Sequence, residues 1–321
     1  MDQPRIDQTN FKFPRQCGVY HGKVRDVYDM GESLLFVASD RYSAFDRNLA
    51  LIPQKGALLT AISRWWFEQT AHIVPNHIIS YPDPNVAWGK KYKVIPIEMI
   101  VRGYITGVTN TSLWHTYSQG RRDYTTFTLP DGLHKNAKLP SPVLTPTTKF
   151  EIHDRNLTPA EAVSEGLIDN DTWDRLQQIA LKLFTFGQQA AAARGLILVD
   201  TKYEFGTDAE GNIVLIDEIH TPDSSRYWRT DTYESSLNAA EEPDNYDKEY
   251  LRLWYKARFD PYASGEAPKV PAEAVLELTA RYEYVYTRLL EQQYQPATGS
   301  TDELLQRIHS NVCQALAGDK R

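Results

Sequence analysis

Two short apolar runs in the second half of the chain give its clearest structural pattern. Residues 196–199 and 213–216 are aliphatic and β-branched, as the residues of buried strands are. Turn-forming residues fill the segment 206–212 between them. The pattern therefore predicts a β-hairpin.

Charged side chains share one face of this predicted hairpin. Because side chains alternate along a strand, Asp200, Lys202 and Glu204 point to the same side. A turn centred on residues 210–211 places Asp217 opposite Glu204, and a register shift of two residues places it opposite Lys202. Buried carboxylates are unfavourable unless they are paired or bind a cation. The group is either a structural ion-pair cluster or, as we expect, a site for Mg²⁺ and a nucleotide phosphate.

Apolar residues at helical spacing, together with capping residues, predict the helices of the chain. Their expected ranges are 55–70, 158–165, 171–194, 246–259, about 271–293 and about 301–316. A further short helix is expected to open at residue 111 or 112. In the helix at 158–165, Thr158 is the expected N-cap, with Pro159 first and Glu161 third. Thr301 is the expected cap of the last helix.

Strands are predicted mainly in the first hundred residues. A strand following Gly22 and a second at 33–39 form a hairpin, and residues 92–102 form a strand bent at Pro96. The segment 73–88 contains three prolines, so we expect a connecting loop with short extended pieces.

A glycine with basic residues beside it opens the first of these hairpins. Gly22, Lys23 and Arg25 could lay backbone N–H groups and cations along a polyphosphate. The pattern GxxxxGK[ST] is absent, so the turn is not a Walker A loop. A solvated hairpin at the edge of a sheet is the alternative.

Two more polar groups follow predicted strands. Asp40, Arg41 and Ser43 come directly after the strand at 33–39, where ligands often bind, although a cap and turn would use the same residues. Arg102 ends a strand beside glycines and hydroxyl residues, and Glu98 has the same strand parity. A guanidinium there suits a phosphate monoester, and an ordinary structural arginine is the alternative.

Composition narrows the class of protein. The 321 residues suffice for two domains or two closely joined lobes. A net charge of -7 without a Lys/Arg run argues against nucleic-acid binding. No apolar run approaches the ~20 residues of a membrane helix, and the N-terminus lacks a secretory signal. Cys17 and Cys313 are far apart, which favours reduced thiols and a cytoplasmic location.

Five stretches, in this order along the chain, resemble one family: phosphoribosylaminoimidazole-succinocarboxamide synthase, or SAICAR synthetase. They are GKVRDVY (22–28), ASDRYSAFD (38–46), PIEMIVRGYITG (96–107), LVDTKYEFG (198–206) and IDEIHTPDSSRYW (216–228). The resemblance implies an α+β fold of two lobes with an ATP cleft between them. Residues 1–100 would form an antiparallel, β-rich, kinase-like lobe. Residues 101–321 would form an α+β lobe with the catalytic hairpin 196–219 and a helical C-terminus.

The resemblance also implies a reaction of de novo purine biosynthesis. ATP, L-aspartate and carboxyaminoimidazole ribonucleotide would give the succinocarboxamide, ADP and phosphate, through an acyl phosphate. The partners would be these small molecules alone, and the chain a monomer or homodimer. A small-molecule kinase and a non-catalytic nucleotide-binding module are the competing hypotheses. The protein-kinase signatures HRD and DFG are absent, so a protein kinase is not expected.

Roles at the ATP site follow from the resemblance. Gly22, Lys23 and Arg25 would cover the phosphates, and Glu98 would contact adenine. Mg²⁺ would bind Glu204 and Asp217. Lys202 would neutralise charge on the transferred phosphoryl group, and Asp200 would orient that lysine.

Roles at the ribonucleotide site follow in the same way. Arg102 and Arg226 would grip the 5′-phosphate or a carboxylate. The resemblance places three residues around the substrate cavity, namely Asp40, Arg41 and Ser43. The loop that contains Thr148, Lys149, Glu151 and Asp154 matches a loop of the family, so Asp154 would be a substrate contact. Many family members have a serine at the position after Gly107, the last glycine of the PIEMIVRGYITG motif. This chain has Val108 at that position, so Ser112 would take over the serine's role.

Overall fold

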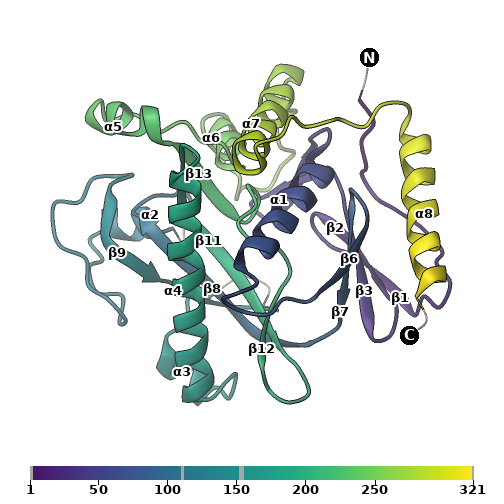
Figure 1. The fold of residues 1–321 in the computed structure, drawn as a ribbon. Helices are drawn as coiled ribbons and strands as arrows, with labels where there is room; N and C mark the ends of the chain where they lie inside the picture. The colour runs from purple at the N-terminus through teal and green to yellow at the C-terminus, as the bar shows by residue number, and fades with distance from the viewer. Residues whose placement is uncertain (1–2, 110–111, 152–154, 320–321) are drawn as a thin grey trace. The chain divides into compact units, whose positions relative to one another are not determined.

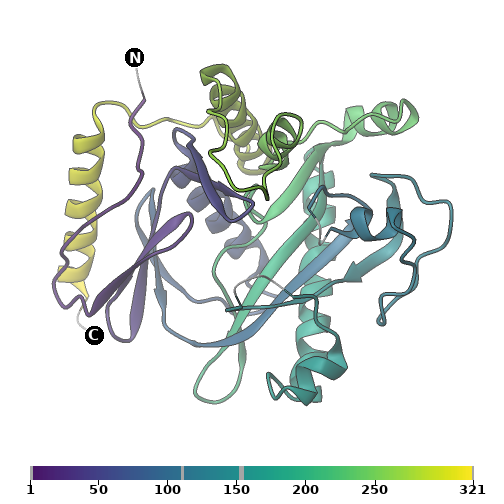
Figure 2. The ribbon, with the colours of Figure 1, turned by 180° about the vertical axis from the view of Figure 1, so that it is seen from behind.

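The computed structural model describes residues 3–109, 112–151 and 155–319. Backbone contacts divide the chain into two compact units (Figures 1 and 2). The first comprises Met1–Trp65, His77–Lys91 and Leu251–Arg321, and the second comprises Trp66–Asn76 and Tyr92–Tyr250. The C-terminal helices thus cluster with the N-terminal strands. The division into ligand-binding lobes at residue 100 stays a prediction.

An antiparallel sheet of five strands forms the centre of the first unit. Its order is β1-β2-β3-β7-β6, and all neighbouring strands are antiparallel. The strands are β1 (Gly18–His21), β2 (Arg25–Asp29), β3 (Ser33–Ala38), β6 (Ile78–Asp83) and β7 (Val86–Lys90). A separate hairpin joins β4 (Arg41–Ala44) to β5 (Arg47–Leu51). The hairpin predicted after Gly22 is confirmed as β2–β3, and Gly22 itself lies in the turn between β1 and β2.

The C-terminal helix α8 (Thr301–Gly318) packs beside this sheet (Figure 1). Its buried residues Ile308 and Val312 join the apolar core of the strands, which includes Tyr28 and Leu35. Ser300 caps α8 through a capping box with Glu303, one residue before the cap predicted at Thr301. Burial of this apolar stripe holds the two ends of the chain in one unit.

The remaining helices agree broadly with their predicted positions. They are α1 (Lys55–Thr70), α2 (Leu113–Ser118), α3 (Pro159–Ser164), α4 (Asn170–Ala192), α6 (Glu249–Lys256) and α7 (Ala272–Leu290). The predicted capping box of α3, between Thr158 and Glu161, is confirmed. Helix α5 (Thr230–Asn238) was not predicted. None of the helices in the described ranges combines the length and apolarity of a membrane span.

Strands β6 and β7 correct the loop expected at 73–88. Pro82 lies in β6, which ends the strand order of its sheet. A proline is tolerated there because an edge strand leaves its outward N–H groups unpaired.

Two long strands form the centre of the second unit. β8 (Lys93–Tyr104) and β11 (Leu196–Thr207) pair antiparallel over most of their length. Around them lie β9 (Lys138–Leu144), β10 (Thr147–Thr148), β12 (Ile213–Ile216) and β13 (Ser225–Arg229). β11 pairs with β8, β12 and β13, and α4 packs on β11 and β8. β11 is therefore the strand around which this unit is arranged.

The predicted hairpin is confirmed as β11–β12, but both predicted registers are wrong. Glu204 pairs with Ile216, so Asp217 lies opposite neither Glu204 nor Lys202. The cause is the loop, where Asp208 accepts hydrogen bonds from the backbone N–H groups of Glu210 and Asn212. These bonds place Thr207 opposite Ile213, and Asp217 leaves the strand with a left-handed backbone (φ 70°).

Candidate active site

One face of β11 carries the charges that the sequence singled out. In the pairing with β8, Asp200 lies opposite Arg102, and Glu204 lies opposite Glu98. β13 on the other side places Arg226 opposite Asp200. The alternation of side chains along β11 thus creates two charged groups, one around Lys202 and one around Asp200.

The first group, which we call the lysine cluster, consists of Lys202, Lys149, Glu98 and Glu204. Lys202 Nζ lies 2.7 Å from Glu98 Oε1 and 2.5 Å from Glu204 Oε1. Lys149 Nζ lies 2.5 Å from Glu204 Oε2 and 4.0 Å from Glu98 Oε1. Two cations and two carboxylates therefore neutralise one another on the strand face.

These contacts shift the pKa values of the cluster in opposite directions. Burial alone would lower the pKa of Lys202, but the surrounding carboxylates, including Asp217, raise it above its ordinary value. Burial would also raise the pKa of Glu204, but the charges of Lys202 and Lys149 lower it to about 2. Both groups therefore stay ionised at neutral pH.

The second group, the arginine cluster, is built on Asp200. Asp200 Oδ2 accepts from Arg226 Nη1 at 2.6 Å and from Arg102 Nη1 at 3.3 Å. Arg226 also donates to Glu249 at 3.1 Å, and Arg102 Nε donates to Thr145 at 2.8 Å. Asp200 therefore binds the two arginines, whereas the resemblance implied that it would orient Lys202.

Ser112 lies beside the arginine cluster. A Cβ atom added to Gly107 would come 3.2 Å from both Ser112 Oγ and Arg226 Nη2. Gly107 also has a φ of 105°, which favours glycine. The glycine therefore allows the serine hydroxyl and the guanidinium to approach the same backbone segment. The role predicted for Ser112 stays a prediction, and this placement agrees with it.

Glu98 contacts residues of the lysine cluster. Its carboxylate accepts from Lys202 and from Thr147 Oγ1, the latter at 3.3 Å. It therefore belongs to the lysine cluster, and its contact with adenine stays a prediction.

The candidates in the first unit occupy two settings. Gly22 and Lys23 lie in the turn before β2, which Arg25 begins, and Ser43 is a buried residue of β4. Asp40 is almost fully buried and accepts from the backbone N–H groups of Ile6 at 2.7 Å and Gly56 at 2.9 Å.

Asp40 therefore binds the start of α1, as the cap-and-turn alternative proposed, and burial raises its pKa to about 6. Arg41 is also buried, with its guanidinium directed to protein acceptors. Asp154 lies outside the described residues.

Carboxylate oxygens are suitable ligands for Mg²⁺, but they form no cage here. Within the described ranges, no group of three or more His, Cys, Asp or Glu residues could hold a metal ion. Mg²⁺ typically binds one or two carboxylates, water and substrate phosphates. Glu204 and Asp217, whose charge acts on Lys202, fit that limited donor set.

Sequence reasoning missed two features of this site. The first is the membership of Lys149 in the lysine cluster, for which its place in the loop expected to contribute Asp154 was the only signal. The second is a buried pair on the opposite face of β11, where Tyr203 Oη and His220 Nε2 share a hydrogen bond. Tyr227 Oη donates to the carbonyl of His220 at 2.6 Å. The first contact ties the segment after Asp217 to β11, and the second ties it to β13.

Comparison with known proteins gives consistent matches. A family model described as SAICAR synthetase matches residues 18–268. The phosphoribosylaminoimidazole-succinocarboxamide synthase of Legionella pneumophila (strain Paris) is 52% identical over 289 residues, covering 90% of this chain and 92% of the relative. The SAICAR synthase from Saccharomyces cerevisiae, solved in complex with SAICAR, matches with a TM-score of 0.74 at 33% identity, covering 89% of this chain and 99% of that one.

A second solved structure, of a SAICAR synthetase in complex with ADP, matches with a TM-score of 0.66 at 26% identity. The match covers 87% of this chain and 100% of that chain. These likenesses confirm the α+β fold that the motifs implied.

The lysine cluster predicts a pH dependence of stability. The folded-state pKa of Glu204 is depressed from 4.5 to about 2, so its stabilising contribution is present above about pH 4.5 and is lost as pH falls toward 2. Wild type should exceed Glu204→Gln in unfolding free energy by about 3 kcal/mol at pH 7. Denaturant titrations between pH 7 and 3 should show this difference shrinking. A difference that stays constant over that range would contradict the assignment.

Proposed function

The chain belongs to the SAICAR synthetase family, and on this basis we propose how its residues carry out the reaction. The protein is an ATP-dependent ligase that joins L-aspartate to carboxyaminoimidazole ribonucleotide in purine biosynthesis. One observation carries the proposal about residues: the lysine cluster and the arginine cluster share one face of β11. Lys202 and Asp200 are two residues apart, roughly 7 Å along a strand, so one ribonucleotide can contact both clusters.

The arginine cluster is the proposed site for the 5′-phosphate of the ribonucleotide. Arg102 and Arg226 converge on the single carboxylate of Asp200, which leaves the cluster one positive charge in excess before Glu249 is counted. A guanidinium group can bind two phosphate oxygens at once through two of its N–H groups. Asp200 fixes the orientation of both arginines and leaves other N–H groups of each guanidinium for a phosphate. Ser112 supplies a hydroxyl beside them.

The lysine cluster is the proposed site of phosphoryl transfer. Lys202 is held between two carboxylates, so its ammonium is fixed in position before the substrates bind. A fixed cation stabilises charge on the transferred group without reorganisation during the reaction. Glu204 and Asp217 would hold Mg²⁺, which when bound neutralises phosphate oxygens of ATP.

The order of bond changes follows from the chemistry of a carboxylate, which is a poor acceptor for an amine. An oxygen of the imidazole carboxylate attacks the γ-phosphorus of ATP, ADP departs, and an acyl phosphate forms. The amine of aspartate then attacks the acyl carbon, and phosphate departs with the carboxylate oxygen. A cytoplasmic location and a monomer or homodimer complete the proposal, since nothing in this chemistry needs a further partner.

Oxygen labelling tests the acyl phosphate. Ribonucleotide labelled with ¹⁸O in both carboxylate oxygens should yield phosphate with one ¹⁸O per turnover, and only when aspartate is present. Mass spectrometry of the phosphate measures this transfer. Unlabelled phosphate would reject the acyl phosphate, and a stable phosphorylated product without aspartate would favour the small-molecule kinase.

Substitution of Arg102 tests the phosphate site. Arg102→Lys keeps the charge beside Asp200 but loses the planar pair of donors, so the KM for the ribonucleotide should rise about tenfold or more. The KM for ATP should change less than about twofold. Arg122→Lys is the matched control, because Arg122 belongs to the same unit and contacts Tyr117 and Asp131 rather than Asp200. An unchanged ribonucleotide KM in Arg102→Lys would exclude this role.

A further inference from the structure

We propose that Arg41 is a positioning residue for ATP, because it holds the turn between β1 and β2 in the conformation that binds phosphate. The inference rests on the proposed ATP-dependent reaction and on the role that the family resemblance implies for this turn, which is to cover the phosphates of ATP. It replaces the direct substrate contact that the family motif implied for Arg41.

The guanidinium of Arg41 binds the turn from inside the first unit. Its Nη2 donates to the carbonyl of Gly22 at 3.0 Å, and its Nε donates to the carbonyl of Lys23 at 3.2 Å. The next carbonyl, of Val24, accepts from the backbone N–H of Ser39 at 3.0 Å and from its hydroxyl at 2.8 Å. Arg41 and Ser39 thus bind three consecutive carbonyls of the turn.

These bonds fix the direction of the N–H groups as well. In a trans peptide unit, a carbonyl and the N–H of the following residue point in opposite directions. Because the carbonyls of Gly22 and Lys23 point to Arg41, the N–H groups of Lys23 and Val24 point away from it. Neither N–H has a hydrogen-bond partner among the described residues. Two successive N–H groups with a common direction suit an anion such as a phosphate oxygen.

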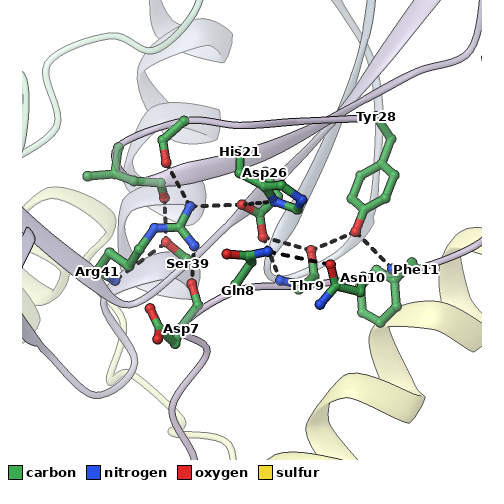
Figure 3. A network of polar contacts seen from close by, with 12 residues as sticks. Asp7, Gln8, Thr9, Asn10, Phe11, His21, Asp26, Tyr28, Ser39 and Arg41 are labelled. Atoms are coloured by element: carbon green, nitrogen blue, oxygen red, sulfur yellow. Dashed lines mark hydrogen bonds and ion pairs between the residues drawn. The ribbon is translucent and has the colours of Figure 1, made fainter. Parts of the chain in front are cut away.

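Arg41 is itself anchored by a buried network (Figure 3). Its Nη2 lies 2.8 Å from Asp26 Oδ1, and its Nη1 donates to the carbonyl of Asp7. Asp26 is fully buried and also accepts from the backbone N–H of Thr9 at 2.6 Å and from His21 at 3.0 Å. Burial would raise the pKa of Asp26, but the bonds from Thr9, Arg41 and His21 lower it.

Direct contact between Arg41 and a ligand would disrupt this network. The side chain is 6% exposed, and each of its three nitrogens has a protein acceptor. The effect of Arg41 on ATP therefore passes through the backbone of the turn. A residue that only stabilised the unit would not act on ATP affinity in particular.

Substitution of Arg41 tests this distinction. Arg41→Lys keeps a cation beside Asp26 but cannot bind all the carbonyls, so the KM for ATP should rise about tenfold. The turnover number and the KM for the ribonucleotide should stay within about twofold. Ser39→Ala removes one of the two bonds to the carbonyl of Val24 and should raise the KM for ATP about two- to threefold.

Two further variants make the result specific. Arg307→Lys is the matched control, because Arg307 forms a similar double contact with the buried Asp83 of the same unit. It should leave the KM for ATP unchanged. Lys23→Ala tests the turn itself and should raise that KM.

The outcomes separate the inference from the proposed function. A raised KM for ATP in Lys23→Ala, with no change in Arg41→Lys or Ser39→Ala, would overturn the positioning role and leave the turn as the ATP site. An unchanged KM for ATP in Lys23→Ala, Arg41→Lys and Ser39→Ala together would remove the turn from the ATP site, and the role of Arg41 with it. Equal losses of thermal stability in Arg41→Lys and Arg307→Lys, without a change in KM, would show a structural role only. If Arg41→Lys does not fold, Ser39→Ala decides.

Discussion

Neutralising the buried charges along β11 is the constraint on which the second unit depends. Asp200, Lys202 and Glu204 share one face of a strand that is paired on both sides. A buried charge without a partner is strongly unfavourable, so each of the three has to meet opposite charge on a neighbouring strand or loop. The register of β8 and β13 places Glu98 beside Lys202, and it places Arg102 and Arg226 beside Asp200. Glu204 pairs instead with Lys202 of its own strand and with Lys149. These ion pairs offset the cost of burying charged side chains in the sheet. They also hold the cations in fixed positions, as binding and transfer of phosphate require.

The first unit solves a similar problem with its backbone. A tight turn leaves carbonyls and N–H groups without strand partners, and Arg41 and Ser39 bind the carbonyls. The N–H groups are left for a ligand. In the first unit an arginine fixes the direction of backbone groups, whereas in the second unit the carboxylate of Asp200 fixes the direction of two arginines. A residue that the sequence suggests as a direct ligand contact can therefore act on the ligand indirectly, by fixing the direction of the groups that bind it.

The sequence predicted elements better than contacts. The hairpin β11–β12 and the capping box of α3 follow from local patterns that need no distant partner. The register of the hairpin did not follow, because Asp208 shapes the loop through side-chain bonds that alternation does not encode. The partners of Asp200 could not be derived either, since they depend on which strands flank β11. Their residue numbers differ from 200 by 98 and 26.

The contacts of Asp40 and Arg41 could not be derived from the sequence either. They stand next to each other in a motif, yet Asp40 accepts from backbone N–H groups, and Arg41 donates to carbonyls of the turn. The residue types were compatible with both a helix cap and a ligand site. Only the hydrogen bonds of the folded chain distinguish these two alternatives. His220 gave no signal at all, because its role comes from a partner on the buried face of β11.

Anomalous scattering from a bound metal ion tests whether phosphoryl transfer takes place at the lysine cluster. Crystals of the protein grown with ADP and Mn²⁺ would locate the ion in place of Mg²⁺. This placement of phosphoryl transfer predicts an anomalous peak within ligand distance of Glu204 and Asp217, directly or through one water, with Lys202 beside the phosphates. A peak held by other residues, with Lys202 still bound between Glu98 and Glu204, would contradict it.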